Sequence, residues 1–360
     1  MPETLDIVVP VYRGEAETRA CLESVLAARV RRAAEVVVID DASPEPAISA
    51  WLQSLAAEKR ITLLAHRSNR GFVASVNEGM ALHADRDVVL LNSDTEVADG
   101  WIDRIGAHFD SDPAIATVTP FSTNATICSY PQTLASNALP PGESTASLDA
   151  AFARANAGRR VDIPTAVGFC MAIRRRALDR VGLFDFERYG AGYGEEVDFC
   201  MRAARAGMRS VLAGDVFVLH VGEVSFGGSG AERRAKAQAT VDSLYPEFQQ
   251  RLAEFIARDP PRMLRRRADL ERLRRSPLDI QVEVPSAGCK RLYWPRAGEE
   301  FSLWFDSRRD IEAMARLNEA VTSDAPLPEL EERWLVAPRA AAPAPAPVSR
   351  GLLERLRRLF

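Results

Sequence analysis

Four short apolar runs in the first hundred residues constrain the fold more than any other feature of the chain. They start at residues 5, 35, 61 and 87 and read LDIVVPVY, EVVVID, ITLLAH and DVVLLN. Short runs rich in β-branched residues are typical of strands that are buried on both faces of a parallel sheet. The intervals of 26–30 residues leave room for one helix between successive strands. We therefore expect an α/β fold with right-handed crossovers, in which helices flank a mostly parallel, Rossmann-like sheet.

Between the four apolar runs, apolar residues recur at the spacing of a helix. Apolar residues at i, i+3, i+4 and i+7 predict a helix from Ile48 to Leu55, and steps of four predict another from Phe72 to Met80. Ser43, followed by Pro44, is the expected N-cap of the first helix. Further along we expect strands over 115–121 and 165–175, a loop over 120–148, a helix over 195–207 and a strand, turn and strand over 211–222.

The last third of the chain changes in composition. It is expected to be helical after Gly230 and carries seven arginines between residues 262 and 275. Short strands are predicted within 278–305. An Ala/Pro-rich linker follows at 337–348, and residues 351–360 have the pattern of a short amphipathic helix.

Charge and composition exclude several classes of protein. The chain has 46 basic and 50 acidic residues, whereas a general nucleic-acid binder needs a net basic face. The longest aliphatic stretches fall far short of the roughly 20 residues of a membrane helix, and the acidic start is unlike a secretory signal. Five scattered cysteines without a C-x-x-C pair favour reduced thiols. We therefore expect a cytoplasmic protein that binds no nucleic acid.

Polar clusters follow the predicted strands at the end where α/β sheets bind ligands. They are Pro10 to Arg13, Asp40 with Asp41, Asn69 to Gly71, and Asn92 to Asp94. Carboxylates there could bind a ribose, a base edge or a divalent cation that bridges phosphates, or could merely cap the next helices. No P-loop and no G-x-G-x-x-G motif is present. A metal ion is therefore the favoured partner for a diphosphate, with Asp94 as its candidate ligand.

A second acidic cluster begins the helix predicted at 195. Glu195, Glu196 and Asp198 repel one another, which tends to raise at least one pKa, so the cluster suits a general base. Acidic residues are also ordinary in a first helical turn. The glycine-rich turn before them and the downstream His220 favour the functional interpretation, although a lone histidine is more often structural than a metal ligand.

Residues 5–230 resemble family 2 glycosyltransferases with the A-type, nucleotide-diphospho-sugar fold. The segments that carry the resemblance are IVVPVYRG, VVVIDDASPE, NRGFVASVNEGM, DVVLLNSDTEV, AVGFCMAIRRRALDRVGLFD, GYGEEVDFCMRAARAG and FVLHVGEVSFG. The pattern is most similar to bacterial polysaccharide-assembly enzymes, including rhamnosyltransferase-like and galactofuranosyltransferase-like branches.

The resemblance implies a role for each matching residue. Asp94 and His220 would hold Mg²⁺ or Mn²⁺ on the donor diphosphate. Glu196 would be the base that activates the acceptor, with Glu195 and Asp198 beside it. Asn92 and Glu196 stand where the family usually has aspartate. The implied donor-binding residues are Pro10, Tyr12, Asp40, Asp41, Arg70, Asn92 and Ser93.

The resemblance also implies an organisation of the chain. Residues 1–110 would be the half that binds the nucleotide-diphospho-sugar donor, and residues 111–230 the half that binds a glycan or lipid-linked acceptor. The remaining parts would be a helical, arginine-rich extension at 231–276, a small region at 277–336, the linker at 337–350 and the helix at 351–360. Through that last helix, the enzyme would contact a partner or the inner face of the membrane, unless the helix docks on its own protein.

The expected function is an inverting, metal-dependent glycosyltransferase in cell-surface polysaccharide biosynthesis. A non-catalytic module that binds nucleotide sugars or glycans and recruits partners through its tail is the alternative. A nucleotidyltransferase is less favoured, because the segment after the first strand is not a glycine-rich basic loop. The base of the donor, uridine or thymidine, stays open.

Overall fold

The structure is a computed structural model, and it describes most of the chain up to residue 274. The described residues are 4–190, 192–222, 230–274, 281–286, 289–294, 299–304, 310, 312–313, 315–316, 319 and 332–335. The predicted linker at 337–350 and amphipathic helix at 351–360 lie outside them.

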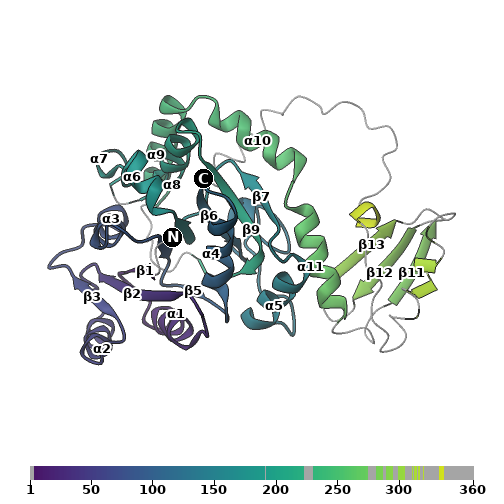
Figure 1. Cartoon of the computed structure of the whole chain (residues 1–360), viewed down its shortest axis with the longest axis horizontal. Coiled ribbons are helices and arrows are strands. Elements are labelled where there is room, and N and C mark those ends of the chain that lie inside the picture. Colours follow the sequence, from purple (N-terminus) through teal and green to yellow (C-terminus); the bar gives the residue numbers. More distant parts are fainter. Residues whose placement is uncertain are drawn as a thin grey trace.

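An eight-stranded sheet forms the centre (Figure 1). Its strands are β1 (Thr4–Val11), β2 (Ala33–Asp40), β3 (Thr62–Ala65), β4 (Val88–Leu91), β6 (Ile115–Phe121), β7 (Arg160–Ile163), β8 (Cys170–Ile173) and β9 (Arg209–Phe217). Their order is β3-β2-β1-β4-β8-β6-β9-β7. The first four are parallel, as are β6 and β9, whereas β8 is antiparallel to both of its neighbours and β7 is antiparallel to β9. The expected α/β sheet is therefore present, with β8 as an antiparallel link between its halves.

Helices cover both faces of this sheet. They are α1 (Glu15–Ala27), α2 (Pro46–Ala57), α3 (Phe72–Leu82), α4 (Trp101–Ser111), α5 (Thr145–Ala155), α6 (Arg175–Val181), α7 (Phe186–Tyr189) and α8 (Glu195–Arg205), with a 3-10 turn at Thr126–Cys128. In Figure 1, α1 and α2 lie below the β3–β2–β1 edge and α3 lies above it. The predicted apolar stripe of α2 is largely confirmed, because Ile48, Leu52 and Leu55 are buried in the core.

The predicted N-cap at Ser43 is wrong. The second helix begins at Pro46, with Glu45 as its N-cap residue. The Asp40 carboxylate accepts bonds from the backbone of Ser43 (2.8 Å) and the hydroxyl of Ser49 (2.5 Å). These bonds hold the residues after β2 in a turn, so the proline that occupies the first helical turn is Pro46 and not Pro44.

The segment predicted as strand, turn and strand over 211–222 holds two strands, the end of β9, which runs unbroken from Arg209 to Phe217, and a short strand at Leu219–His220, with Val218 alone between them. Within β9, the N–H of Gly214 donates to the carbonyl of Arg159 (2.8 Å). A Cβ at this position would lie only 2.8 Å from that carbonyl oxygen. The glycine therefore permits a close backbone approach inside the sheet.

A second, two-stranded sheet completes the edge where β1, β2 and β4 end. Its strands are β5 (Thr95–Glu96) and β10 (Leu219–His220), which are antiparallel and place His220 opposite Thr95. In the main sheet Val11 lies opposite Asp40, and Val8 lies opposite Leu90. The polar residues that follow β1, β2 and β4 consequently meet at one edge, as the sequence predicted.

The chain continues into three helices and a small sheet. They are α9 (Gly230–Leu244), α10 (Phe248–Arg258) and α11 (Arg262–Arg274), then antiparallel strands β11 (Gln281–Ser286), β12 (Cys289–Trp294) and β13 (Glu299–Trp304) and a 3-10 turn at Glu332–Leu335. The arginine-rich run is not wholly solvated, since Arg272 is buried and bonds Tyr130 and Glu143. Within the described ranges, no helix combines the length and the hydrophobicity needed to span a bilayer.

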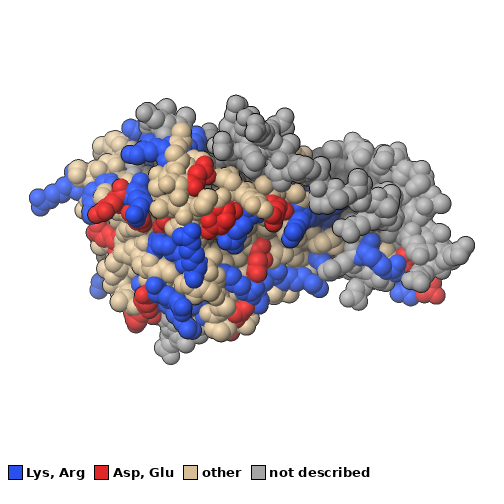
Figure 2. Space-filling view, turned by 90° about the horizontal axis from the view of Figure 1, so that it is seen from above, with Lys and Arg blue, Asp and Glu red and all other residues tan. Residues whose placement is uncertain are grey.

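Charges of both signs are mixed on the surface. Figure 2 shows basic and acidic side chains interspersed over the described part of one face, with no continuous basic stripe there. Cys21, Cys128, Cys170 and Cys200, the cysteines whose side chains the structure describes, are buried free thiols, in line with the reduced state expected from the sequence.

Candidate active site

Asp94 and His220 lie together at the edge of the sheet, as predicted. The β5–β10 pairing brings them there from positions far apart in the chain. The His220 Nε2 atom is 3.4 Å from Oδ1 of Asp94. The backbone N–H of Gly222 donates to Oδ2 of the same carboxylate (3.0 Å). Burial raises the pKa of Asp94, but the bonds from His220 and Gly222 outweigh it, so the pKa lies below its ordinary value. The group therefore remains a carboxylate at neutral pH.

The orientation of His220 suits a metal ligand. Its Nδ1 lies 2.6 Å from the carbonyl oxygen of Asn124, so this nitrogen must carry a proton. The ring also stacks on Phe169, with centroids 5.1 Å apart. Metal-binding histidines are commonly fixed in this way, with one nitrogen donating to a carbonyl and the other directed at the metal. Nε2 faces Asp94, where either a second proton or a divalent cation can bridge the two groups.

Asn92 and Ser93 complete this motif. The Asn92 amide nitrogen lies 3.5 Å from Nε2 of His220, and its backbone N–H donates to the carbonyl of Phe169 (2.8 Å). Ser93 is buried. The protein thus offers two side-chain ligands, Asp94 and His220. Because Mg²⁺ typically takes one or two carboxylates together with substrate phosphates and water, the donor set fits a cation that is shared with a diphosphate.

A different cluster holds three ligand-type side chains. In the described part of the chain, only Asp6, Glu35 and His83 place three such ligand atoms within 4.8 Å of one another. Arg86 already occupies this cluster, since its Nη1 lies 2.9 Å from Asp6 and 2.6 Å from Glu35. The Arg86 cation neutralises these carboxylates, so we interpret the cluster as a structural ion-pair network.

The two aspartates that follow β2 hold the surrounding loops. Both oxygens of Asp40 accept the bonds described above. Asp41 accepts the backbone N–H groups of Arg70 (2.7 Å) and Gly71 (2.8 Å) and pairs with Nδ1 of His66 (2.7 Å). Both carboxylates are buried. A loop-holding role is therefore established for each, and contact with the donor stays a prediction.

Arg70, Tyr12 and Pro10 are more accessible. The Arg70 guanidinium is half-exposed and pairs with Glu78 (2.6 Å). Tyr12 is partly buried just beyond β1, with the Arg13 guanidinium 5.2 Å from its ring centroid. Pro10 is partly exposed near the end of β1. These residues line the same edge as Asp94, and their contact with a nucleotide stays a prediction.

The acidic cluster lies in the first turn of α8. Gly194, in a left-handed conformation, is the N-cap residue, and Glu195 and Glu196 are the first two residues of the helix. The helix predicted over 195–207 therefore begins where the sequence indicated, with Glu196 inside its first turn. A glycine N-cap has no side chain that could accept a hydrogen bond from the first N–H groups of the helix. These N–H groups are therefore available to an anion.

Glu195 and Glu196 both have raised pKa values. Burial is the main cause for each, and repulsion from Glu196 adds to it for Glu195. The Oε2 atom of each side chain is buried without a hydrogen-bond partner. Glu195 is only 5% exposed, whereas Glu196 is partly exposed. Glu196 is thus the more accessible of two carboxyl groups whose raised pKa values favour proton acceptance.

Asp198 is engaged differently. Its Oδ1 accepts a bond from the hydroxyl of Tyr245 (2.7 Å), and its Oδ2 pairs with Nε of Arg202 (2.8 Å). The side chain is buried. With a donor on each oxygen, Asp198 holds the helix in place and is poorly disposed to act as the base.

The segment before β8 contacts both α8, whose first turn is acidic, and the pair of Asp94 and His220. The N–H of Ala166 donates to Sγ of Cys200 on α8 (3.3 Å). Three residues further on, Phe169 bonds Asn92 and stacks on His220. A candidate base and a candidate metal site are therefore connected through a few residues.

Comparison with known proteins finds a similar family. Residues 6–182 match the family model described as Glycosyl transferase family 2. This stretch, just under half of the chain, is similar to family 2 glycosyltransferases. The matched stretch ends before α8 and β10, so the roles of the acidic turn and His220 rest on the geometry above and on the sequence motifs.

Related proteins support this similarity. The pre-mycofactocin glycosyltransferase of two Mycobacterium tuberculosis strains is 28% identical over 214 residues, which are 56% of this chain and 39% of that protein. The chain thus spans well under half the length of these curated relatives. The structure of GalNAc-T7 with UDP, GalNAc and Mn²⁺ is 15% identical, with a TM-score of 0.51, and covers 75% of this chain and 54% of that one. The expected A-type fold is confirmed.

Several residues that build the site were not predicted from the sequence. Asn124 fixes the orientation of His220, His66 bridges Asp41 and Glu78, and Tyr245 holds Asp198. Each lies 12 to 96 residues from its partners in these contacts. The position of a residue after a strand indicates contact with a ligand, but it does not reveal which other residues hold that residue in place. No local pattern therefore marked these three residues.

Replacing Glu195 with glutamine should stabilise the protein at alkaline pH. Because the folded-state pKa is raised, the stabilising contribution of the protonated group is lost as pH rises from the ordinary value of 4.5 through the raised pKa. Glutamine cannot ionise and avoids this loss. The melting temperature of Glu195→Gln relative to the natural protein should therefore increase between pH 4 and pH 8. Glu254→Gln, on the exposed face of α10, should show no such trend, and an equal change at every pH would contradict the prediction.

Proposed function

We propose that the chain is an inverting, metal-dependent glycosyltransferase. It would transfer a sugar from a nucleotide-diphospho-sugar to a hydroxyl group of a glycan or a lipid-linked acceptor. The observation that carries the proposal is that one short segment contacts both candidate groups. Ala166 bonds α8, whose first turn holds Glu196, and Phe169 stacks on His220 of the Asp94–His220 pair.

Asp94 and His220 would hold the divalent cation, Mg²⁺ or Mn²⁺. A bound cation would neutralise the diphosphate and stabilise the negative charge that develops on it as the glycosidic bond breaks. The donor set of one carboxylate and one oriented imidazole supports this assignment. The similarly folded GalNAc-T7 structure has UDP and Mn²⁺ bound, in keeping with it.

Glu196 would accept the proton of the acceptor hydroxyl. As the hydroxyl oxygen attacks the anomeric carbon, the bond to the nucleoside diphosphate breaks on the opposite side, and the configuration inverts. A base is most effective when its pKa lies near the working pH. Burial shifts the pKa of Glu196 upward, in the direction of that condition, and Asp198, with both oxygens bonded, does not offer an alternative base.

The biological role that we propose is cell-surface polysaccharide biosynthesis in the cytoplasm. It is suggested by the similarity of the sequence motifs to those of rhamnosyltransferase-like enzymes. The curated relative is named for pre-mycofactocin, so pre-mycofactocin belongs in the acceptor panel. Uridine and thymidine diphosphate sugars are the first donors to test.

Donor hydrolysis without acceptor tests the proposal. A transferase that activates its donor should slowly release nucleoside diphosphate in the presence of Mn²⁺, whereas a non-catalytic binding module should bind the donor without turnover. The measurement is nucleoside diphosphate release from a panel of sugar nucleotides with Mn²⁺ and with EDTA. Binding of a sugar nucleotide without turnover, with acceptors present as well, would favour the binding module.

The C-terminal ten residues carry a separate prediction. Leu352, Leu353, Leu356, Leu359 and Phe360 would form one stripe of a helix that also carries three arginines. We propose weak attachment to an anionic membrane, which a short amphipathic helix can provide. The full-length protein should float with anionic vesicles, and a chain ending at residue 336 should not. Equal, negligible flotation of the two would contradict the membrane role.

A further inference from the structure

We propose that Tyr245, at the junction of α9 and α10, is a positioning residue for the Glu195–Glu196 turn and acts through Asp198. The inference rests on the proposed function, since it concerns the residue that keeps the proposed base in place. Tyr245 lies beyond the stretch that matches the family and within the segment predicted to be a separate helical extension.

The first observation is the bond from Tyr245 to Asp198. The tyrosine hydroxyl donates to Oδ1 (2.7 Å), while Arg202 occupies Oδ2 (2.8 Å). Tyr245 and Asp198 are each 3% exposed. Removing the hydroxyl would leave a buried carboxylate oxygen without its donor, and that oxygen would have to find another partner. Because Asp198 lies in the same helical turn as Glu195 and Glu196, its movement would displace them.

The second observation is that α8 holds the same junction through another residue. The Arg205 guanidinium lies 4.5 Å from the centroid of the Tyr245 ring. It also donates to the carbonyl of Leu244 (3.1 Å) and pairs with Glu247 (3.2 Å). The junction of α9 and α10 thus contacts α8 at two places, its first turn through Asp198 and its last turn through Arg205. Tyr245 takes part in both contacts.

The third observation is the close packing of α9 on the N-cap of α8. A Cβ at Gly194 would lie 3.3 Å from Val241 of α9 and 3.1 Å from the ring of Tyr189. Gly194 also has a φ of +83°, which favours glycine. The turn that presents the two glutamates therefore packs against α9 at its N-cap.

The opposite side of α8 is tied to the donor-binding half. Arg202 donates to the carbonyls of Val181 and Leu183. The next residue, Phe184, exchanges two hydrogen bonds with the side-chain amide of Asn77 on α3 (2.9 and 3.1 Å). Asp198 is thus held from two sides. Arg202 connects it to the segment before α7, and Tyr245 connects it to the helical extension. Arg188 and Tyr189 of α7 also interact electrostatically with Asp198.

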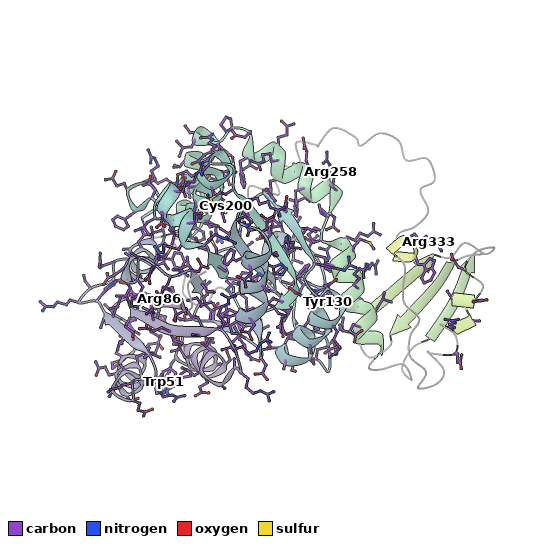
Figure 3. All side chains as sticks on the ribbon, viewed as in Figure 1. Trp51, Arg86, Tyr130, Cys200, Arg258 and Arg333 are labelled. Atoms are coloured by element: carbon purple, nitrogen blue, oxygen red, sulfur yellow. The ribbon has the colours of Figure 1, made fainter. Side chains whose placement is uncertain are left out.

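The test compares two tyrosine-to-phenylalanine variants. Tyr245→Phe should lower kcat for transfer about ten- to a hundredfold, the range expected from loss of a buried hydrogen bond to a charged group, with the donor KM unchanged. Tyr130→Phe is the matched control, because the Tyr130 hydroxyl is equally buried and donates to Asp269 (2.6 Å). Figure 3 shows Tyr130 well apart from Cys200 of α8. The control should keep the natural kcat. Equal losses in the two variants, or a loss confined to the donor KM, would overturn the proposal.

A double variant tests whether Tyr245 acts through Asp198. If the hydrogen bond carries the effect, Tyr245→Phe combined with Asp198→Asn should be little worse than Asp198→Asn alone, since residues in one network are not additive. Multiplication of the two separate losses would show that Tyr245 acts by another route.

Amide hydrogen exchange tests the inference independently of activity. Tyr245→Phe should accelerate exchange at residues 194–198, and Tyr130→Phe should not, because only the former loosens the first turn of α8. Unchanged exchange at 194–198 would overturn the positioning role. Absence of turnover in the natural protein with every donor and acceptor would contradict the proposed function instead, and the exchange result would still decide the role of Tyr245.

Discussion

Replacing Asp94 with asparagine should abolish donor turnover while the fold is retained. The carboxylate is the anionic ligand of the proposed metal site, and its pKa below the ordinary value keeps it charged. Asparagine preserves the shape and an oxygen but loses the negative charge. A metal ion contributes several kcal/mol to transition-state stabilisation, which corresponds to a loss of roughly a thousandfold or more in rate. The measurement is nucleoside diphosphate release at saturating Mn²⁺.

Asp87→Asn is the matched control for this variant. Asp87 and Asp94 flank the same strand, β4, at opposite ends, and both are 7% exposed. Asp87 also accepts a backbone N–H, that of Arg175 (2.8 Å). The control should retain turnover. Full activity of Asp94→Asn, or full activity of the natural protein in EDTA, would refute the metal assignment.

Replacing Glu196 with glutamine should reduce acceptor-dependent transfer by about 10²–10⁴, the usual contribution of a general base. Glutamine keeps the size and polarity of the side chain but cannot accept the proton. Donor affinity, measured by calorimetry, should be unchanged because the residues predicted to bind the donor lie at or after the ends of β1, β2, β3 and β4 and not in the first turn of α8. In the natural enzyme, the raised pKa of Glu196 should also place the acidic limb of the pH–rate profile above the ordinary glutamate range.

Two companion variants distinguish the roles of the acidic residues. Glu195→Gln should have a milder effect on transfer, because Glu195 is the less accessible of the pair. Asp198→Asn should lower the rate through the position of the turn. Near-normal transfer by Glu196→Gln, together with an inactive Asp198→Asn, would identify Asp198 as the base and refute the assignment to Glu196.

The fold was largely predictable because its signals are local. The runs that form β1 to β4 are apolar over consecutive residues, and the stripe of α2 repeats within eight residues. The prediction failed where a local signal fitted two positions. Pro44 and Pro46 could each stand in a first helical turn, and the bonds that Asp40 accepts from Ser43 and Ser49 decide for Pro46.

The site was predictable only in part, for the same reason. Motif spacing identified Asp94 and His220, whose proximity then followed from pairing of β5 with β10. The partner that orients His220 is a single loop residue, Asn124, 96 positions away. Asp198 shows the opposite case, since its acidic motif indicated chemistry while Tyr245, 47 positions away, makes it a support. Partners brought together by tertiary structure leave no periodic pattern in the sequence.

Donor activation is the central claim, and one measurement tests it most directly. The natural protein should first be screened for thermal stabilisation by nucleoside diphosphates and sugar nucleotides with Mn²⁺, because stabilisation grows with the ratio of ligand concentration to Kd. Nucleoside diphosphate release from the most stabilising sugar nucleotide is then measured in Mn²⁺ and in EDTA. The account predicts release that requires the metal and that is lost in Asp94→Asn. Release at the same rate in EDTA, or no release from any sugar nucleotide with or without acceptor, would contradict it.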